Sequence, residues 1–273
     1  MKRKKTVPSP QSLKLVLVFG ICVAILIVAS LILKSISILA KSKFDGQHRF
    51  TIAVIKPKSP ITLLSFASET SSISILHVHG GLKAQTIGKD LETPIDSFIF
   101  VKETSEDNIT KEKIEPFVGG LVWKHELLGS SLTILDAIRL FLFTRSVHAN
   151  NTQEKELFLP KEESAIDKLS SGLFTNSTIA QEKMSIEIVN GTGVSGLGNR
   201  LARLISNMGG NVISISTSDS PKDQSQLLYV GEKTYTVDTL SSVLNIKAVQ
   251  TEKPGLSDIV ITIGKKDLDN VPF

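Results

Sequence analysis

The sequence predicts a single N-terminal transmembrane helix followed by extracytoplasmic α/β (α+β) domains, the last of which is a small unit of two βαβ-like halves. Two observations support this fold class. Residues 15–33 form one long apolar run, and beyond them short β-rich runs alternate with segments whose apolar residues recur at helical spacing. We therefore expect one membrane crossing and an exported part large enough for one or two small domains with their own cores.

The apolar run at residues 15–33 contains no charged side chain. As a helix it would measure about 28 Å, which matches the roughly 30 Å hydrocarbon core of a bilayer. Residues 1–14 carry five Lys or Arg and no acid, so the positive-inside bias makes them a cytoplasmic tail and places the bulk of the chain outside. The apolar region of a cleaved signal peptide is shorter, about 7–15 residues, so we expect a retained single-pass anchor in the cell membrane.

The net charge of +4 is concentrated at the N-terminus. Residues 1–43 carry eight of the 31 basic residues and no acid, which leaves 23 basic against 27 acidic residues in the exported part. That balance lacks the basic surface that nucleic acids require, so we expect no nucleic-acid partner. The one cysteine, Cys22, lies in the apolar run, which excludes a disulfide or a cysteine metal cluster outside the membrane.

Residues 44–174 are predicted to form the first exported α/β region. Helix 133–145 begins after the capping sequence at residues 130–133, and its Phe141 and Phe143 are expected to pack on their own domain, with lipid or a partner as the alternative. Residues 175–183 are polar and aperiodic, and we place a linker there. The expected strands of this region are 50–55, 61–66, 73–78, 95–101 and 155–159, and its helices are 133–145 and 165–174.

The most informative segment is residues 187–198, which reads as an apolar strand, a turn with Asn190 and four glycines, and the start of an amphipathic helix. It opens the last unit, residues 184–267. Strands are expected there at 186–189, 211–216, 226–230, 246–250 and 258–263, and helices at 196–208 and 235–244.

Two families use a strand, glycine turn and helix of this kind. Gly191-x-Gly193-x-x-Gly196 satisfies the dinucleotide-binding fingerprint, and Asp219 follows the next strand, where a ribose-binding acid belongs. The unit is too short for two mononucleotide-binding halves, however, so we expect no cofactor. The pair Asn190-Gly-Thr-Gly-Val-Ser-Gly-Leu197 and Asp258-Ile-Val-Ile-Thr-Ile-Gly264 resembles, in the right order, the C-terminal domain of the LytR–CpsA–Psr cell-envelope proteins.

Residues 44–174 resemble, more faintly, a shortened and degenerate LytR–CpsA–Psr domain. In that family the domain transfers glycopolymers from a polyprenyl pyrophosphate carrier to the cell wall, with arginines on the pyrophosphate and acids on a metal. Residues 79–82, His-Gly-Gly-Leu, occupy the position of the family's Pro-Arg-Asp-Thr, so the resemblance implies that the transferase chemistry is lost. The alternative is an active phosphotransferase, which requires other basic residues to hold the phosphates. The candidates are Lys56, Lys58, Lys83 and Arg49.

The predicted function is therefore a non-catalytic binding or interaction module, accessory to cell-wall or glycopolymer assembly. A helix N-terminus favours negative groups, so a wall glycopolymer or another envelope protein could bind at the glycine turn, although a purely structural turn is the alternative. We predict no catalytic residue and no metal site: His77 and His79 share one face of a strand, but no third ligand is identifiable. The predicted ligand-binding residues are Asn190, Gly191, Thr192, Gly193, Ser195 and Gly196.

Overall fold

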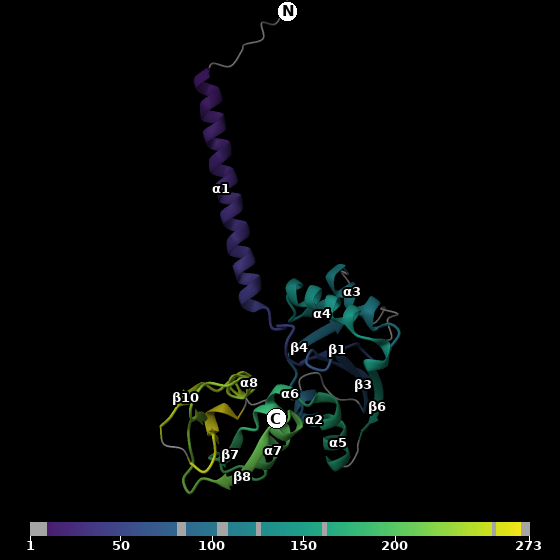
Figure 1. The fold of residues 1–273 in the computed structure, drawn as a ribbon, viewed down its shortest axis with the longest axis vertical. Helices are drawn as coiled ribbons and strands as arrows, with labels where there is room; N and C mark the ends of the chain where they lie inside the picture. The colour runs from purple at the N-terminus through teal and green to yellow at the C-terminus, as the bar shows by residue number, and fades with distance from the viewer. Residues whose placement is uncertain are drawn as a thin grey trace, which may run out of the picture.

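A computed structural model of the chain describes residues 10–80, 86–102, 109–123, 127–159, 163–252 and 255–268. One long helix leads into an N-terminal sheet with helices on both faces, and a second, C-terminal sheet lies beyond it (Figure 1). Both sheets mix parallel and antiparallel strands, which confirms the predicted fold class.

The first element is helix α1, Pro10–Lys41. Its residues from Val18 to Lys41 are apolar enough and numerous enough to cross a membrane, and the most apolar stretch of 18 residues is not buried by the rest of the described chain. An anchor and a signal sequence both have this character. The helix extends beyond the predicted run because Lys34 interrupts the apolar residues only briefly, and Ile36, Ile38 and Leu39 follow it.

The N-terminal sheet has the strand order β5-β4-β1-β2-β3-β6. Its centre is the antiparallel set β1 to β3, with β4 parallel to β1 and β6 parallel to β3. Every residue of β2 is buried, as expected of a strand covered on both faces. The bounds are β1 Phe50–Ile55, β2 Ile61–Ala67, β3 Ser72–His79, β4 Ser97–Val101, β5 Leu127–Ser130 and β6 Thr152–Phe158.

Two helical layers enclose this sheet. Helices α3, Ile114–Trp123, and α4, Ile134–Ser146, cover one face, while α2, Ile87–Leu91, and α5, Glu163–Phe174, cover the other. Phe141 and Phe143 pack against the first layer's core, as predicted. The sequence did not predict α2, α3 or β5. Helix α3 contains Pro116, Gly119 and Gly120, which obscure its period, and the other two elements have five and four residues.

The predicted linker at residues 175–183 is mostly helix. Asn176 caps helix α6, Ser177–Glu182, by accepting hydrogen bonds from the backbone N–H groups of Thr178 and Ile179. The Ile179 side chain is buried in the core of the C-terminal sheet. A single turn and a half of helix is too short to show periodicity in the sequence.

The C-terminal sheet has the order β10-β9-β11-β7-β8. The segments β7-α7-β8 and β9-α8-β10 are both parallel βαβ units, which confirms the two predicted halves. Strand β11 joins them, because it lies parallel to β7 and antiparallel to β9. The bounds are β7 Ser185–Asn190, α7 Leu197–Asn207, β8 Asn211–Thr217, β9 Gln226–Tyr229, α8 Tyr235–Leu244, β10 Ala248–Gln250 and β11 Ile259–Ile263.

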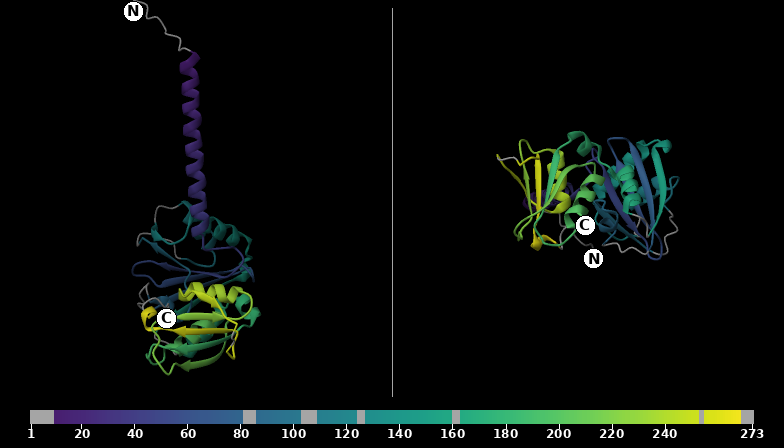
Figure 2. Two further views of the ribbon diagram at one scale, coloured as in Figure 1. Left: turned by 90° about the vertical axis from the view of Figure 1, so that its left-hand side faces the viewer. Right: turned by 90° about the horizontal axis from the view of Figure 1, so that it is seen from below.

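The two sheet units are packed together through α5 and α7 (Figure 1). Arg203 of α7 forms ion pairs with the buried Glu92, at 2.7 Å, and with Asp167 of α5, at 3.1 Å. Asn207 of α7 also donates a hydrogen bond to the Glu92 carbonyl oxygen at 3.1 Å. The C-terminal sheet thus lies on the side of the N-terminal sheet that is remote from α1 (Figure 2).

Candidate functional site

The glycine turn predicted as a binding site connects the end of β7 to α7. Its polar side chains bond mostly to the turn itself: the Asn190 Oδ1 atom accepts from the Thr192 backbone N–H at 3.0 Å and from the Thr192 hydroxyl at 2.7 Å. Asn190 Nδ2 donates to the Val194 carbonyl oxygen, and the Thr192 hydroxyl oxygen accepts from the Val194 N–H. Asn190 and Thr192 are both buried. They hold the shape of the turn and do not face solvent.

The glycines of this turn have two different physical roles. A Cβ atom on Gly191 would lie 2.7 Å from Lys222 Cβ and 2.8 Å from the Ile263 carbonyl oxygen, so this position requires a residue without a side chain. Gly193 and Gly196 have φ angles of 79° and 80°, a conformation that glycine adopts without strain. Neither of them has a heavy atom within 4 Å of the position of an added Cβ.

Three of the six predicted ligand-binding residues are therefore exposed. Gly193, Ser195 and Gly196 lie at the surface immediately before α7, and Gly196 is the N-cap residue of that helix. Glycine supplies no capping side chain, and none hydrogen-bonds at this cap. The first N–H groups of α7 thus carry the positive end of the helix dipole at the surface.

Two lysines that the sequence did not connect with the turn approach it from later segments. The Lys222 N–H donates to the Gly191 carbonyl oxygen at 2.8 Å, and the Lys265 N–H donates to the Lys222 carbonyl oxygen at 2.9 Å. Both side chains are exposed. This edge of the sheet, at the carboxyl ends of β7 and β11, consequently combines a helix N-terminus with two exposed lysine residues. Such an arrangement suits a negatively charged ligand.

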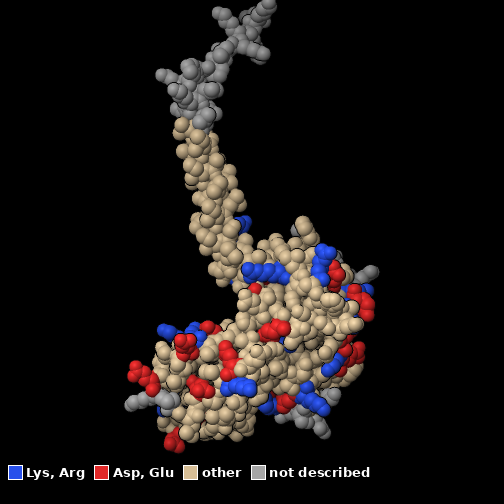
Figure 3. All heavy atoms as spheres, in the orientation of Figure 1, with Lys and Arg blue, Asp and Glu red and all other residues tan. Residues whose placement is uncertain are grey.

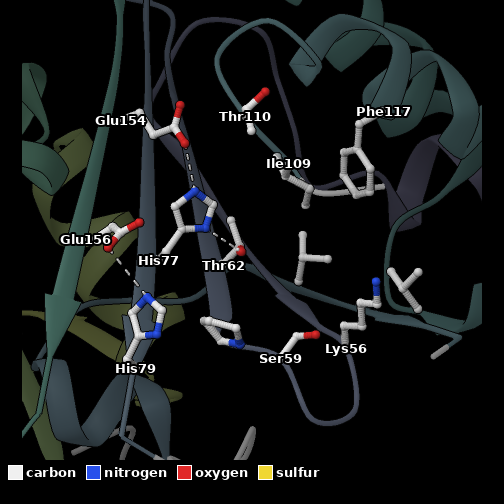
Figure 4. A pocket seen from close by; sticks show the side chains of 13 residues that line it. Lys56, Ser59, Thr62, His77, His79, Ile109, Thr110, Phe117, Glu154 and Glu156 are labelled. Atoms are coloured by element: carbon white, nitrogen blue, oxygen red, sulfur yellow. Dashed lines mark hydrogen bonds and ion pairs between the residues drawn. The ribbon is translucent and has the colours of Figure 1, made fainter. Parts of the chain in front are cut away.

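A second candidate site is a pocket of about 320 Å³ beside β3 and β6 of the N-terminal sheet (Figure 4). The His77 ring pairs through Nδ1 with the Thr62 hydroxyl at 3.0 Å and through Nε2 with Glu154 at 3.1 Å. His79 Nε2 lies 3.9 Å from Glu156, and its ring stacks on Phe158. Across the described ranges, no group of three His, Cys, Asp or Glu side chains is arranged to hold a metal ion.

The remaining wall of this pocket is mainly apolar and includes Val54. Ile109 and Phe117 lie across the pocket from His77, and Lys56 enters from the β1–β2 connection (Figure 4). Arg49, which the phosphotransferase alternative would place beside Lys56, precedes β1 while Lys56 follows it. The rise of an extended strand separates them by about 20 Å. Arg49 instead donates to the Leu173 carbonyl oxygen at 2.6 Å and to the Ser65 hydroxyl at 2.9 Å.

The basic cluster that this alternative requires is thus divided. Lys58 neighbours Lys56 in the β1–β2 connection, but Arg49 is at the other end of the sheet. Lys83 lies outside the described residues, as do Gly81 and Leu82. His79 and Gly80, which begin the segment at the family's Pro-Arg-Asp-Thr position, lie at the end of β3.

Comparison with known proteins bears on the C-terminal unit. A family model described as LytR cell envelope-related transcriptional attenuator matches residues 183–266. No curated protein matches the chain. A crystal structure of a Listeria innocua protein aligns with 83% of this chain and 96% of its own, at 12% identity and a TM-score of 0.18.

A Listeria monocytogenes protein described as a putative transcriptional factor aligns with 84% of this chain and 96% of its own, at 11% identity and a TM-score of 0.17. TM-scores this low do not establish a shared fold. The family match, in contrast, spans the glycine turn, both helices and all five strands of the C-terminal sheet. Residues 183–266 of this chain are therefore a LytR C-terminal domain, a domain of cell-envelope proteins.

Proposed function

We propose that this chain is a membrane-anchored extracytoplasmic protein whose LytR C-terminal domain is a binding module accessory to cell-wall or glycopolymer assembly. The observation that supports this most is the position of the domain at the far end of the molecule from α1 (Figure 2). With α1 retained in the membrane and residues 1–14 in the cytoplasm, both sheet units lie outside the bilayer, and the C-terminal unit is the more distant of the two (Figure 2).

The ligand we propose is an anionic wall glycopolymer, bound at the carboxyl edge of the C-terminal sheet. The α7 N-terminus contributes about 0.3–1 kcal/mol toward a negative group. Lys222 and Lys265 add two charges beside it. Because phosphate and carboxylate groups repeat along such a polymer, several weak contacts of this kind add up through multivalency.

The test is co-sedimentation of the full chain, in detergent, with purified cell wall. The double variant Lys222→Glu and Lys265→Glu should weaken retention by about tenfold, which corresponds to roughly 1.4 kcal/mol. Lys183→Glu, at the opposite edge of the same sheet, is the control and should leave retention unchanged. If the double variant is retained like the wild type, the turn has only a structural role. If the wild-type chain is not retained, the proposed ligand is wrong.

The phosphotransferase alternative is favoured by one observation, the partly apolar pocket with Lys56 at its rim (Figure 4). An active enzyme should co-purify with a polyprenyl-linked phosphate, and Lys56→Ala should abolish that association. The separation of Arg49 from this pocket favours the non-catalytic function.

A further inference from the structure

The chain leaving α1 is fixed directly onto α4, with no flexible stalk between them. One oxygen of Asp136, Oδ1, accepts hydrogen bonds from the Ser42 hydroxyl at 2.7 Å and from the backbone N–H groups of Lys43 and Phe44, both at 2.9 Å. Arg139, one turn further along α4, donates to the Phe44 carbonyl oxygen at 2.8 Å. Since α1 ends at Lys41, α4 is held within a few residues of the end of the apolar helix.

The face of α4 that points away from the sheet is apolar. Ile134, Ile138 and Leu142 follow one another at intervals of four residues, which places them on one face of the helix. Their exposed fractions are 55%, 40% and 60%. The opposite face of α4 packs on the core through Ala137 and Leu140.

The neighbouring helix adds an aromatic residue to this surface. Trp123, at the end of α3, is 84% exposed. Helices α3 and α4 pack side by side and form the layer of the N-terminal unit on the side where α1 enters (Figures 1 and 2). Basic side chains occupy the junction between α1 and this layer, where Lys41 and Lys43 are exposed (Figure 3).

We propose that the outward surface of α3 and α4 lies on the outer leaflet of the membrane that α1 crosses. The inference rests on the proposed function in one respect, that α1 is a retained anchor. Because the Asp136 contacts hold α4 at the end of α1, the apolar stripe formed by Ile134, Ile138 and Leu142 must lie at the level of the lipid headgroups or just above it. Tryptophan and isolated apolar side chains are stable at that boundary, and lysines beside them attract anionic headgroups.

The native chain contains its own probe, because Trp123 is its one tryptophan. The full chain is reconstituted in vesicles of phosphatidylethanolamine and phosphatidylglycerol, with and without bromine on the acyl chains. We expect Trp123 in the vesicles to emit at shorter wavelength than in the chain unfolded by denaturant. The brominated lipids should quench this fluorescence, and iodide in the surrounding solution should not. Emission that iodide quenches and brominated lipids do not would overturn the inference.

A second measurement tests α4 itself with a matched control. In a Cys22→Ser background, Ile138→Cys should react slowly with a water-soluble maleimide in the same vesicles. Ile213→Cys should react fast, because Ile213 is 50% exposed on β8, in the unit remote from α1. Equal rates at the two positions would contradict contact with lipid.

The wild-type Cys22 separates this inference from the proposed anchor. If Cys22 reacts in intact vesicles, α1 does not span the bilayer and the proposed function fails with it. If Cys22 is protected while the Ile138→Cys variant reacts as fast as Ile213→Cys, α1 spans the bilayer as proposed and only the contact of α4 with lipid is wrong. Protection of position 138 in native membranes but not in pure lipid vesicles would assign the stripe to a protein partner and overturn the lipid contact.

Discussion

Two carboxyl groups near the end of α1 have pKa values shifted in opposite directions. Burial opposes ionisation of Asp136, but hydrogen bonds from the Phe44 N–H, the Ser42 hydroxyl and Thr133 outweigh it and lower the pKa of its carboxyl. Asp96 accepts one hydrogen bond on its carboxylate, from the Thr51 N–H at 2.6 Å. Burial dominates there and raises the pKa of Asp96 to about 6.

The raised pKa of Asp96 predicts that the free energy of unfolding depends on pH. The folded state holds this proton up to about pH 6, whereas the unfolded chain releases it near the ordinary value of 3.8, so stability falls as the pH rises through that window. Asp96→Asn keeps an acceptor for the Thr51 N–H and should raise the free energy of unfolding at pH 7 by about 3 kcal/mol, the equivalent of the pKa shift. Thermal unfolding at pH 4 and pH 7 measures this, and a variant less stable than the wild type at pH 7 would contradict it.

The two glycine roles in the turn after β7 predict different costs for the same substitution. Gly191→Ala should destabilise the C-terminal sheet by about 3 kcal/mol, because the added methyl group overlaps the Lys222 stem and the β11 backbone. The methyl group of Gly193→Ala would point into open space, so this variant should be destabilised by only about 1 kcal/mol, because alanine is strained at the positive φ of this position. Hydrogen exchange of the β7 and β11 amides measures both, and equal loss of protection in the two variants would refute the distinction.

At the scale of elements, the contact between α7 and the N-terminal unit depends on a buried ion pair. Glu92 has 6% of its side chain exposed and pairs with Arg203 at 2.7 Å. Breaking this pair leaves the buried Glu92 with the longer pair to Arg200, at 3.6 Å, so its loss costs more than the intact pair contributes.

Arg203→Met should therefore lower the free energy of unfolding by about 3 kcal/mol. The control is Arg145→Met, which removes a surface pair with Glu115 in which both side chains are more than half exposed, and it should cost less than about 1 kcal/mol. Denaturant unfolding of both variants gives the comparison. A similar shift in the two midpoints would mean that Arg203 does not bind the units together.

Elements whose signals are local were predictable from the sequence. Helix α8 has the predicted limits, with Thr234 as its N-cap and Asn245 in the left-handed conformation after its last turn. Helix α3 was missed because its signal is not local: Gly119 would bring a Cβ to 3.0 Å from the Phe141 ring, so the glycine permits close packing of α3 on α4. Only the folded structure contains that neighbour.

The candidate site was predictable in part for the same reason. The glycine motif identified the turn, but which of its side chains face inward depends on the bonds between Asn190 and Thr192. Lys222 and Lys265 belong to other segments, and no motif connects them with the turn. The contacts of Asp136 likewise join residues more than 90 positions apart, which no periodicity reveals.

At the scale of the whole molecule, the proposed anchor and the two packed units predict a defined topology. Protease added outside right-side-out vesicles should remove nearly everything beyond Lys43, while a tag on residues 1–14 stays protected by the bilayer. The same protease should reach the tag after detergent is added. Complete protection of the chain in intact vesicles, or release of the tag without detergent, would reverse or remove the proposed anchor.

The central position of β11 has a consequence for how the protein is made. Strand β11 is the last strand of its sheet along the chain, yet it is the common neighbour of β7 and β9. While the chain is still emerging, the two βαβ halves have no shared partner, and each presents an open strand edge. The sheet of this domain can therefore form completely only after residue 263 has been synthesised. A truncated chain that lacks β11 stays incompletely folded and remains a substrate for quality-control proteases.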